Sequence, residues 1–350
     1  MTKRLLLISN KSAHTFNYIN LIQDYFDSVF LITNIKSQDY SGECIAVNFS
    51  LRSPLTILST IKAIRQAYRK FKPDIIHVHQ ANTCALFTLL ALRKFHVPII
   101  LTAYGSDILS TPKENLFYRM MIKYNLNRSD YFTSDSLFMA SVMRNLVKKK
   151  NMEIVLANFG IQVKNSVLPK ENIIFSNRLH KSLYRVAEII QSFSKFYQLH
   201  RADNWKLIVA GEGEETDNLK LLANRLNLSN QVEFVGWLDM NKNIDYYQRA
   251  RIYVTIPYSD ATSISLLESM YYGCIPVVSN LPANGEWILD GLNGVIVENV
   301  NDPFLERALS IDVEKLTSLN KFLIQEKALP EVSKQKYVGL YSQIYATLRK

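Results

Sequence analysis

Short runs of aliphatic and β-branched residues alternate along the whole chain with stretches of helical period. The first series of runs is RLLLIS, VFLIT, IIHVH, PIILT, YFTS and EIVLA, and the second is IIFS, KLIVAG, VEFVG, IYVTI, IPVVS and GVIV. Strands separated by helices of about 10 to 15 residues form parallel sheets that are covered on both faces. The series meet at a polar segment, residues 162–172. The sequence therefore predicts an α/β protein with two doubly wound, Rossmann-like domains, residues 1–165 and 166–332, which face a cleft.

The last segment, residues 333–350, carries apolar side chains at helical spacing: Tyr337, Leu340, Tyr341, Ile344, Tyr345 and Leu348. A helix with such a face needs a surface to pack on. We expect this helix to cross back to the first domain. A length of 350 residues also favours two domains over one.

The positive charge of the chain is confined to its first half. Residues 1–165 contain 21 Lys and Arg against 10 Asp and Glu, whereas residues 166–350 contain 20 against 21. Basic side chains recur on the helical stretches 55–72 and 116–128 and in the run KKK at 148–150. Such patches are attracted to anionic membrane surfaces, although charge runs are also common on solvated faces. We expect a membrane partner and no nucleic acid, because no DNA- or RNA-binding motif accompanies the charge.

The lengths of the apolar runs and the spacing of the cysteines indicate the cellular location of the protein. No apolar run approaches the roughly 18 residues that cross a bilayer. The three cysteines, Cys44, Cys84 and Cys274, are far apart, which predicts neither a disulfide framework nor a metal cluster. We expect a cytoplasmic protein, peripheral at the inner face of the plasma membrane.

The segment SDATSISLLESMYYGC, residues 259–274, places two acids around the start of a predicted helix. Asp260 lies in the loop after a strand, Ser263 suits the N-cap, and Glu268 shares a face with Ile264. A buried carboxylate needs hydrogen-bond donors, and a helix amino terminus attracts anions. Because Ile264 and Glu268 are about 6 Å apart along the axis, the helix start suits a diphosphate with a ribose beside Glu268. Alternatively, Glu268 pairs with a buried arginine or caps backbone groups.

The stretch SDATSISLLESMYYGCIPVVSNLPANGEW resembles the E-x7-E segment of retaining GT-B glycosyltransferases of the family 4 type, the glycosyl transferases group 1. The resemblance implies that Asp260, in place of the usual Glu, contacts the donor sugar and that Glu268 holds the ribose. In SNRLHK, residues 176–181, Arg178 matches a cation that neutralises the leaving diphosphate. The lysine expected five residues later is Leu183, so Lys181 is the candidate substitute.

Other segments extend the resemblance over nearly the whole chain. PDIIHVH at 73–79 and PIILTAYGSD at 98–107 are similar to acceptor-domain strands, with Tyr104 where a His is frequent. The implied donor-binding residues are Gly211, Gly236, Trp237, Leu238, Thr262, Ser263, Ile264 and Ser265. The acceptor-side candidates are His14, Thr15, His79, Tyr104, Gly105, Ser106 and Asp107.

Three local patterns have competing interpretations. The loop VAGEGEE at 209–215 is not a dinucleotide fingerprint, because the fingerprint is incomplete and its three glutamates repel phosphate. Trp237 is expected in the core, although the turn that carries it borders the nucleotide in the family. His77 and His79 are expected to point to opposite faces of their strand, one to the core and one toward the cleft, and no metal is expected there.

Together, these features predict a metal-independent hexosyltransferase without a cofactor. It would move a sugar from a nucleotide sugar, with UDP or GDP as the nucleotide, to a glycan or polyprenyl-linked acceptor. The product would belong to a cell-surface polysaccharide such as lipopolysaccharide or capsule. A nucleotide-sugar 2-epimerase of the same shape and a non-catalytic basic binding protein are the alternatives.

Overall fold

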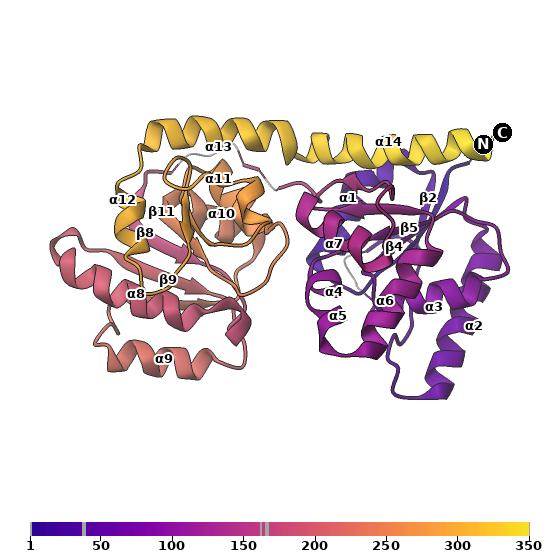
Figure 1. Ribbon diagram of the computed structural model, residues 1–350, viewed down its shortest axis with the longest axis horizontal. Helices are drawn as coiled ribbons and strands as arrows, with labels where there is room; N and C mark the ends of the chain where they lie inside the picture. Colours follow the sequence, from indigo (N-terminus) through magenta and orange to yellow (C-terminus); the bar gives the residue numbers. More distant parts are fainter. Residues whose placement is uncertain (1, 37–39, 162, 165–167, 350) are drawn as a thin grey trace. The chain divides into compact units, whose positions relative to one another are not determined.

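The computed structural model describes residues 2–36, 40–161, 163–164 and 168–349 and divides into two compact units (Figure 1). The first unit runs to Gly160 and resumes at Pro330, and the second spans Ile161–Leu329. The structure divides the chain after Gly160, whereas the expected boundary, residues 165 and 166, lies outside the described residues. Ile161 is buried with Leu266 and Leu267 of the second unit. Its backbone N–H also donates to Ala328 O at 3.1 Å.

The first unit contains a seven-stranded sheet in the order β3-β2-β1-β4-β5-β6-β7, and every pairing is parallel. The direction in which successive strands are added to the sheet reverses between β1 and β4. Open α/β sheets bind ligands at this topological switch point. The strands are β1 Arg4–Ile8, β2 Ser28–Thr33, β3 Cys44–Ala46, β4 Ile75–His79, β5 Ile99–Thr102, β6 Tyr131–Ser134 and β7 Val155–Leu156.

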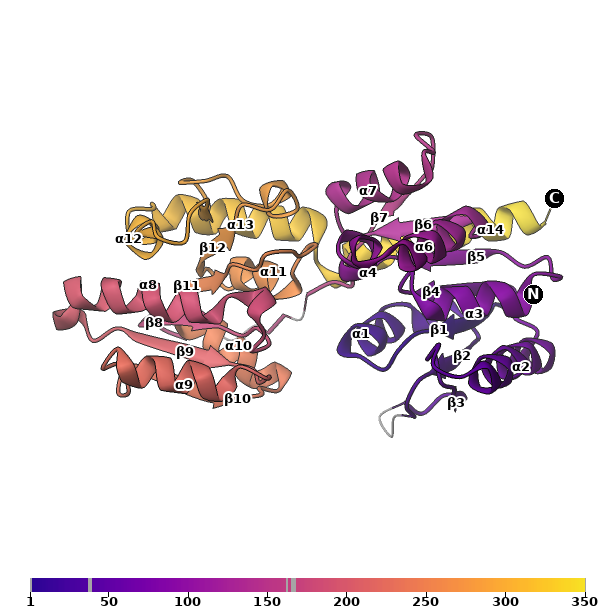
Figure 2. The same cartoon turned by 60° about the horizontal axis from the view of Figure 1, so that its bottom comes forward.

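Helices cover both faces of this sheet (Figure 2). One face packs on α1 Ala13–Ile22 and α14 Pro330–Leu348, through a buried cluster that includes Leu5, Ile75, Tyr18 and Tyr337. This packing confirms that the last helix returns to the first unit. The helices between the other strands are α2 Pro54–Phe71, α3 Thr83–Leu92, α4 Ser106–Leu109, α5 Thr111–Glu114, α6 Leu116–Arg128 and α7 Leu137–Val147, with the 3₁₀ turn η1 Gln23–Tyr25 after α1.

The second unit contains a six-stranded parallel sheet in the order β10-β9-β8-β11-β12-β13. Its order turns back between β8 and β11. The strands are β8 Glu171–Ser176, β9 Lys206–Ala210, β10 Val232–Gly236, β11 Ala250–Thr255, β12 Ile275–Ser279 and β13 Val295–Val297. Its helices are α8 Val186–Leu199, α9 Thr216–Arg225, α10 Met240–Arg249, α11 Ile264–Tyr271, α12 Phe304–Leu309 and α13 Val313–Lys327, with 3₁₀ turns η2 Ser182–Tyr184, η3 Arg201–Asp203 and η4 Asn284–Glu286.

The two sheets confirm the prediction of two doubly wound α/β domains, while some local elements differ from it. Between β12 and β13 the chain forms only the turn η4, and the short edge strand β3 is not among the runs that predict the strands. Across the described residues, the helices are all too short or too polar to span a bilayer.

Candidate functional site

At the carboxyl edge of the second sheet, the loop after β8 packs against the loop after β9 and contacts the loop after β11. Arg178 lies two residues after β8, and its carbonyl oxygen would be only 2.5 Å from a Cβ built on Gly211, whose φ is +103°. A side chain at Gly211 would therefore collide with the backbone of the arginine loop. The sequence motif around 211 thus serves close packing of two loops at this edge.

Arg178 is the central cation of this edge. Its Nη2 donates to Asp260 Oδ2 at 2.6 Å, its Nη1 donates to Ser263 Oγ at 2.7 Å, and its guanidinium lies 4.5 Å from the ring centre of Tyr184. The side chains of Arg178 and Asp260 are 13% and 24% exposed. Burial is the largest single influence and lowers the pKa of Arg178, but the Asp260 carboxylate together with Tyr253 and Tyr184 outweighs it, so this pKa lies above its usual range. This arginine is therefore a fixed, permanent positive charge.

Asp260 holds this arginine with one carboxylate oxygen. Its other oxygen, Oδ1, accepts the backbone N–H of Ala261 at 3.0 Å. From the resemblance, Asp260 was expected to contact the donor sugar and Arg178 the leaving diphosphate. In the structure the two side chains form an ion pair with each other. Asp260 therefore orients Arg178, in addition to any contact of its own with a ligand.

The amino terminus of α11 lies beside the guanidinium. Ser263 is the N-cap residue, but its side chain does not cap the helix, and its Oγ accepts from Arg178 instead. The first N–H groups of a helix have no partner within the helix, and the helix dipole adds partial positive charge there. Arg178, Ile264 and Ser265 thus present a cation and helix-end amides from one small region, an arrangement that suits an anion.

Glu268 is half-buried, in the second turn of α11. The most buried side chains of α11 are Leu266, Leu267, Ser269 and Met270, because this face packs on the cluster around Trp287 and Ile324. Glu268 shares the half-buried face with Ile264, as expected. After burial, the negative charge of Glu268 is the next largest cause of the raised pKa of Tyr247. The charge of Glu268 therefore acts on Tyr247, which lies behind the start of the helix.

A tyrosine and asparagine network behind Arg178 was missed by sequence reasoning. Asn177 donates to Tyr247 OH at 2.7 Å and to Asn243 Oδ1 at 2.9 Å, and it accepts from Tyr253 OH at 2.9 Å. These bonds fix the residue that precedes Arg178. Nothing in the local pattern of residues distinguishes these tyrosines from ordinary core residues.

The remaining donor-side candidates occupy different environments. Trp237 is 71% exposed, so its expected core position is wrong. It follows Gly236, whose positive φ of 66° ends β10 and turns the chain outward. Leu238 is half-buried, and Thr262 is buried in the loop before α11. Lys181 is exposed, and no ion pair of its ammonium group is seen within the described ranges.

The histidines of β4 share one face of the first sheet. Residues two apart on a strand point the same way, so the expectation of opposite faces is wrong. The rings of His77 and His79 lie 4.7 Å apart, and both are buried against Tyr18. His77 Nδ1 lies 2.7 Å from Tyr18 OH and 2.8 Å from Tyr341 OH. His77 therefore belongs to the core that α14 covers.

His79 links this core to the carboxyl edge. Its Nδ1 lies 2.7 Å from Tyr104 OH, and Tyr104 in turn packs edge-on against His14 and against Phe159. His14 is exposed, and Tyr104 and Phe159 are half-buried. The three rings form a partly open aromatic surface at the carboxyl ends of the strands, and Phe159 is a member that the sequence did not indicate.

Asp107, Gly105 and Thr15 have structural roles. The buried Asp107 carboxylate accepts N–H groups from Ala81 at 2.7 Å and from Tyr104 and Gly105 at 3.0 Å each. Both oxygens thus accept backbone N–H groups, Oδ2 from the loop after β4 and Oδ1 from the loop after β5, so Asp107 holds these two loops together. Thr15 is buried and donates to Asn10 O at 2.7 Å. Ser106, at the start of α4, is exposed.

Gln80 is a second residue that sequence reasoning missed. It follows β4 with a φ of 76°, a conformation that is strained for any residue other than glycine. Its Oε1 accepts from Asn10 Nδ2 at 2.8 Å and from Asn82 Nδ2 at 2.9 Å. This pairing turns the Nε2 group of Gln80 away from both asparagines. Strained backbone at a sheet's carboxyl edge is typical of functional sites.

Metal ligands do not cluster in the described ranges: no three His, Cys, Asp or Glu side chains there come together in a group that could hold an ion. The groups that can contact a ligand in the second unit are the fixed cation of Arg178 and the helix-end amides of α11. In the first unit these groups are the rings of His14, Tyr104 and Phe159 and the side-chain amide of Gln80, here called the aromatic and amide surface.

Comparisons with known proteins identify the family. Residues 158–311 match the model of the glycosyl transferases group 1, and residues 3–136 match the glycosyl transferase 4-like model. The alpha-monoglucosyldiacylglycerol synthase of Streptococcus pneumoniae is 22% identical, covering 84% of this chain and 73% of its own. The GDP-mannose:cellobiosyl-diphosphopolyprenol alpha-mannosyltransferase of Xanthomonas campestris is 25% identical, covering 82% and 75%.

Structural comparison agrees with the family models. HepE of Anabaena, solved in complex with UDP-glucose, superposes with a TM-score of 0.78 at 13% identity and covers 97% of this chain and 99% of its own. At this identity the likeness concerns the fold alone. With two family models that together span most of the chain, the protein belongs to the group 1 glycosyltransferases of the family 4 type and has their GT-B fold.

Proposed function

We propose that this glycosyltransferase moves a hexose from a nucleotide-diphosphate sugar to a glycan or lipid-linked saccharide, with retention of configuration, in the synthesis of a cell-surface polysaccharide. The observation that carries the proposal is the junction of Arg178 with the start of α11 through Ser263. Loss of a nucleoside diphosphate develops negative charge on the leaving oxygens. A cation and amides already in place stabilise that charge without reorganisation.

The residues of the second unit divide the work as follows. Arg178 and the helix-end amides of Ile264 and Ser265 hold the diphosphate. Glu268 accepts hydrogen bonds from ribose hydroxyls, and Asp260 keeps Arg178 in place while its exposed edge borders the sugar. In this scheme the departing diphosphate accepts the proton of the attacking hydroxyl on the same face of the sugar. No metal ion is needed, because the protein supplies the positive charge.

The donor is proposed to be a UDP- or GDP-sugar. In support, one relative is named for GDP-mannose and one structural neighbour was solved with UDP-glucose. Trp237 is an exposed aromatic face at the same edge as Arg178, and flat bases stack on such faces.

Nucleotide binding tests this assignment. We expect UDP or GDP, but not both equally, to raise the melting temperature of the protein, because binding to the native state alone stabilises it. Trp237→Ala is expected to weaken the binding of that nucleotide about tenfold, since base stacking on an aromatic side chain contributes about 1 to 3 kcal/mol to the binding free energy. Trp205→Phe, a change in the core, is the control for lost tryptophan. If none of UDP, GDP, ADP and CMP shifts the transition, the donor proposal is wrong.

The acceptor is proposed to lie on the aromatic and amide surface of the first unit. Tyr104, Phe159 and His14 offer ring faces for the apolar side of a sugar, and Gln80 offers its amide N–H groups. Sugars commonly need both kinds of contact, because their rings are apolar on one face and carry hydroxyls at the edge.

Gln80 allows a sharp test. We expect Gln80→Gly and Gln80→Ala to raise the KM for the acceptor about five- to tenfold, because each removes the side-chain amide that donates to it. The glycine variant should be about 1 kcal/mol more stable to urea than the alanine variant, since only glycine adopts a φ of 76° without strain. Acceptor KM values that equal wild type in both variants would show that Gln80 has no role in binding.

A membrane surface is the proposed location of the reaction. The first half of α6 exposes Leu116, Phe117 and Met120 next to Lys113 and Arg119, and α2 exposes Leu55 and Leu58 next to Lys62. Apolar side chains surrounded by basic ones suit the interface of an anionic bilayer. This surface supports an acceptor that is linked to a lipid.

A further inference from the structure

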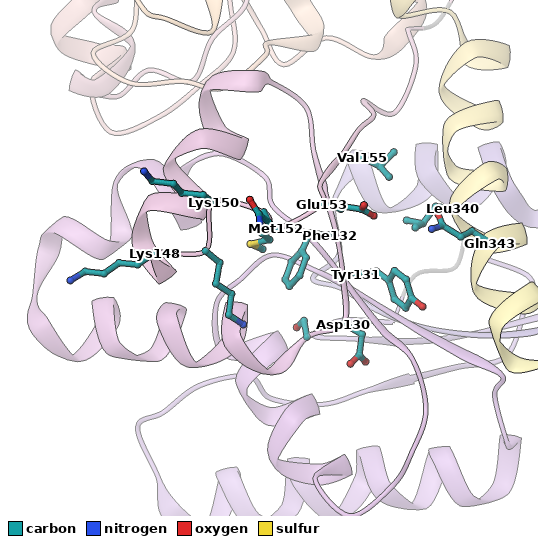
Figure 3. A pocket seen from close by; sticks show the side chains of 13 residues that line it. Asp130, Tyr131, Phe132, Lys148, Lys150, Met152, Glu153, Val155, Leu340 and Gln343 are labelled. Carbon is teal, nitrogen blue, oxygen red and sulfur yellow. The ribbon is translucent and has the colours of Figure 1, made fainter.

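A pocket of about 800 Å³ opens in the first unit where β6 and β7 begin (Figure 3). It is formed by residues 129–132 before and within β6, by residues 148–153 and Val155 after α7, and by Leu340 and Gln343 of α14. Parallel strands all begin at the same edge of a sheet. The pocket is therefore at the opposite end of the strands from Tyr104 and Gln80, and it is separate from the site described above.

The floor of the pocket is apolar. Phe132, Met152 and Leu340 are buried, and Tyr131 and Val155 are half-buried beside them. Figure 3 shows Phe132 and Met152 near the centre of the view, with Val155 and Leu340 toward α14. A volume of this size and an apolar floor match sites for small organic ligands, which are commonly about 300 to 1,000 Å³.

One end of the pocket is strongly positive. Lys148, Lys149 and Lys150 are consecutive and exposed at the end of α7, and none of their ammonium groups forms an ion pair with another residue that the structure describes. In Figure 3, Lys148 and Lys150 extend outward on the same side. Three adjacent like charges repel one another, and their long, rotatable side chains can turn together toward a bound anion.

The two acids that line the pocket do not neutralise this end. Asp130 Oδ2 accepts the backbone N–H of Ile99 at 2.9 Å, which fixes it at the start of β6. Glu153 points toward Leu340 and Gln343, away from the lysines (Figure 3). The pocket thus has a cationic end, an apolar floor and, at Glu153 and Gln343, an end that accepts hydrogen bonds from hydroxyl groups.

We propose that this pocket binds a phosphate-bearing amphiphile. Its phosphate would lie at Lys148–Lys150, its hydrocarbon part on Phe132, Met152 and Leu340, and a hydroxyl at Glu153 and Gln343. A phospholipid in a bilayer and a free, soluble phosphorylated amphiphile both carry this chemistry. The inference is independent of the proposed sugar transfer, because it concerns the opposite edge of the first sheet.

Calorimetric titration of the full chain with soluble dihexanoylphosphatidic acid tests the proposal. We expect binding that weakens at least about tenfold in the variant Lys148→Gln, Lys149→Gln, Lys150→Gln, because each basic residue near a lipid phosphate adds to its attraction. Gln343→Trp, a change at an exposed position that fills the pocket, should weaken binding similarly. The matched α2 control, Lys70→Gln, Lys72→Gln and Lys94→Gln at the ends of α2 and α3, removes the same charge elsewhere in the unit and should bind like wild type.

Three results would overturn the site: no binding, equal binding of inorganic phosphate, or equal weakening in the α2 control. Co-sedimentation with vesicles of phosphatidylcholine and phosphatidylglycerol in equal parts then separates the two sources. Loss of vesicle binding in the Lys148–Lys150 variant supports a bilayer lipid as the occupant. Unchanged vesicle binding in that variant, with loss of the soluble ligand, supports a free molecule. If the α2 variant alone loses the vesicles, the membrane surface of the first unit is separate from the pocket.

Discussion

Replacing Arg178 by alanine is expected to lower the rate of sugar transfer about 100- to 1,000-fold, the usual effect of removing one preorganised donor from a site where charge develops. In the structure this guanidinium contacts Asp260, Ser263 and Tyr184, so it is held before any ligand binds. We expect the loss mainly in kcat, because the leaving diphosphate is more negative in the transition state than in the bound donor. Measured kcat and KM with the donor found by thermal shift would show this division.

Matched variants separate charge from geometry at this position. Arg178→Lys keeps the charge but cannot reach both Asp260 and Ser263 with a planar fork, so we expect it to restore only part of the rate. Asp260→Asn removes the negative charge of the partner that orients Arg178 but keeps an acceptor oxygen, so it should cause a smaller loss than Arg178→Ala. Arg225→Ala, an exposed arginine of α9, is the control and should leave transfer unchanged. If the Arg178→Ala variant and the Glu268→Ala variant both transferred sugar at the wild-type rate, the proposed function would be wrong.

Acidification from pH 7 to pH 5 is expected to lower the stability of the first unit substantially. Burial lowers the pKa of His77 from 6.5 to about 3, and burial lowers the pKa of His79 well below 6.5. Both histidines thus bind fewer protons when folded than when unfolded, so stability rises with pH between the folded and unfolded pKa values. Each pH unit below 6.5 costs about 1.4 kcal/mol per histidine, which gives about 2 kcal/mol for His77 at pH 5.

Urea unfolding followed by circular dichroism at both pH values measures this effect. His77→Gln, which cannot titrate, should lower stability at pH 7 because it disturbs the contacts with Tyr18 and Tyr341, yet it should reduce the difference between pH 7 and pH 5. His96→Gln changes an exposed histidine and should leave the pH dependence as it is. A His77→Gln protein with the full wild-type pH dependence would contradict the assignment to this buried group.

The strands and the return of the last helix could be predicted because they depend on local periodicity. Buried parallel strands need continuous apolar runs, and a helix that packs on a sheet needs an apolar stripe, as in Tyr337, Tyr341 and Ile344. The short elements were missed for the same reason. Three residues, as in β3 or η4, are too few to show a period.

Within the candidate site, Arg178 and the start of α11 could be placed at one edge because residues that follow parallel strands gather there. The exposure of Trp237 could not be predicted, since a tryptophan after a strand suits a core equally well. The pairing of Asp260 with Arg178 joins positions 82 residues apart, and no local pattern contains it. The same holds for Gln80, whose positive φ depends on the bonds that Asn10 and Asn82 make to it.

The sequence by itself therefore determined the two parallel sheets, their order along the chain, the family and the edge at which the candidate site lies, because each depends on patterns within a few neighbouring residues. Only the tertiary structure decided that Asp260 orients Arg178, that both β4 histidines are buried under α14, that Asp107 serves the backbone, and that lysines 148–150 border a pocket. These features depend on contacts between segments far apart in the chain. Which charge is paired, and which polar group is left for a ligand, is set by what the fold places beside it.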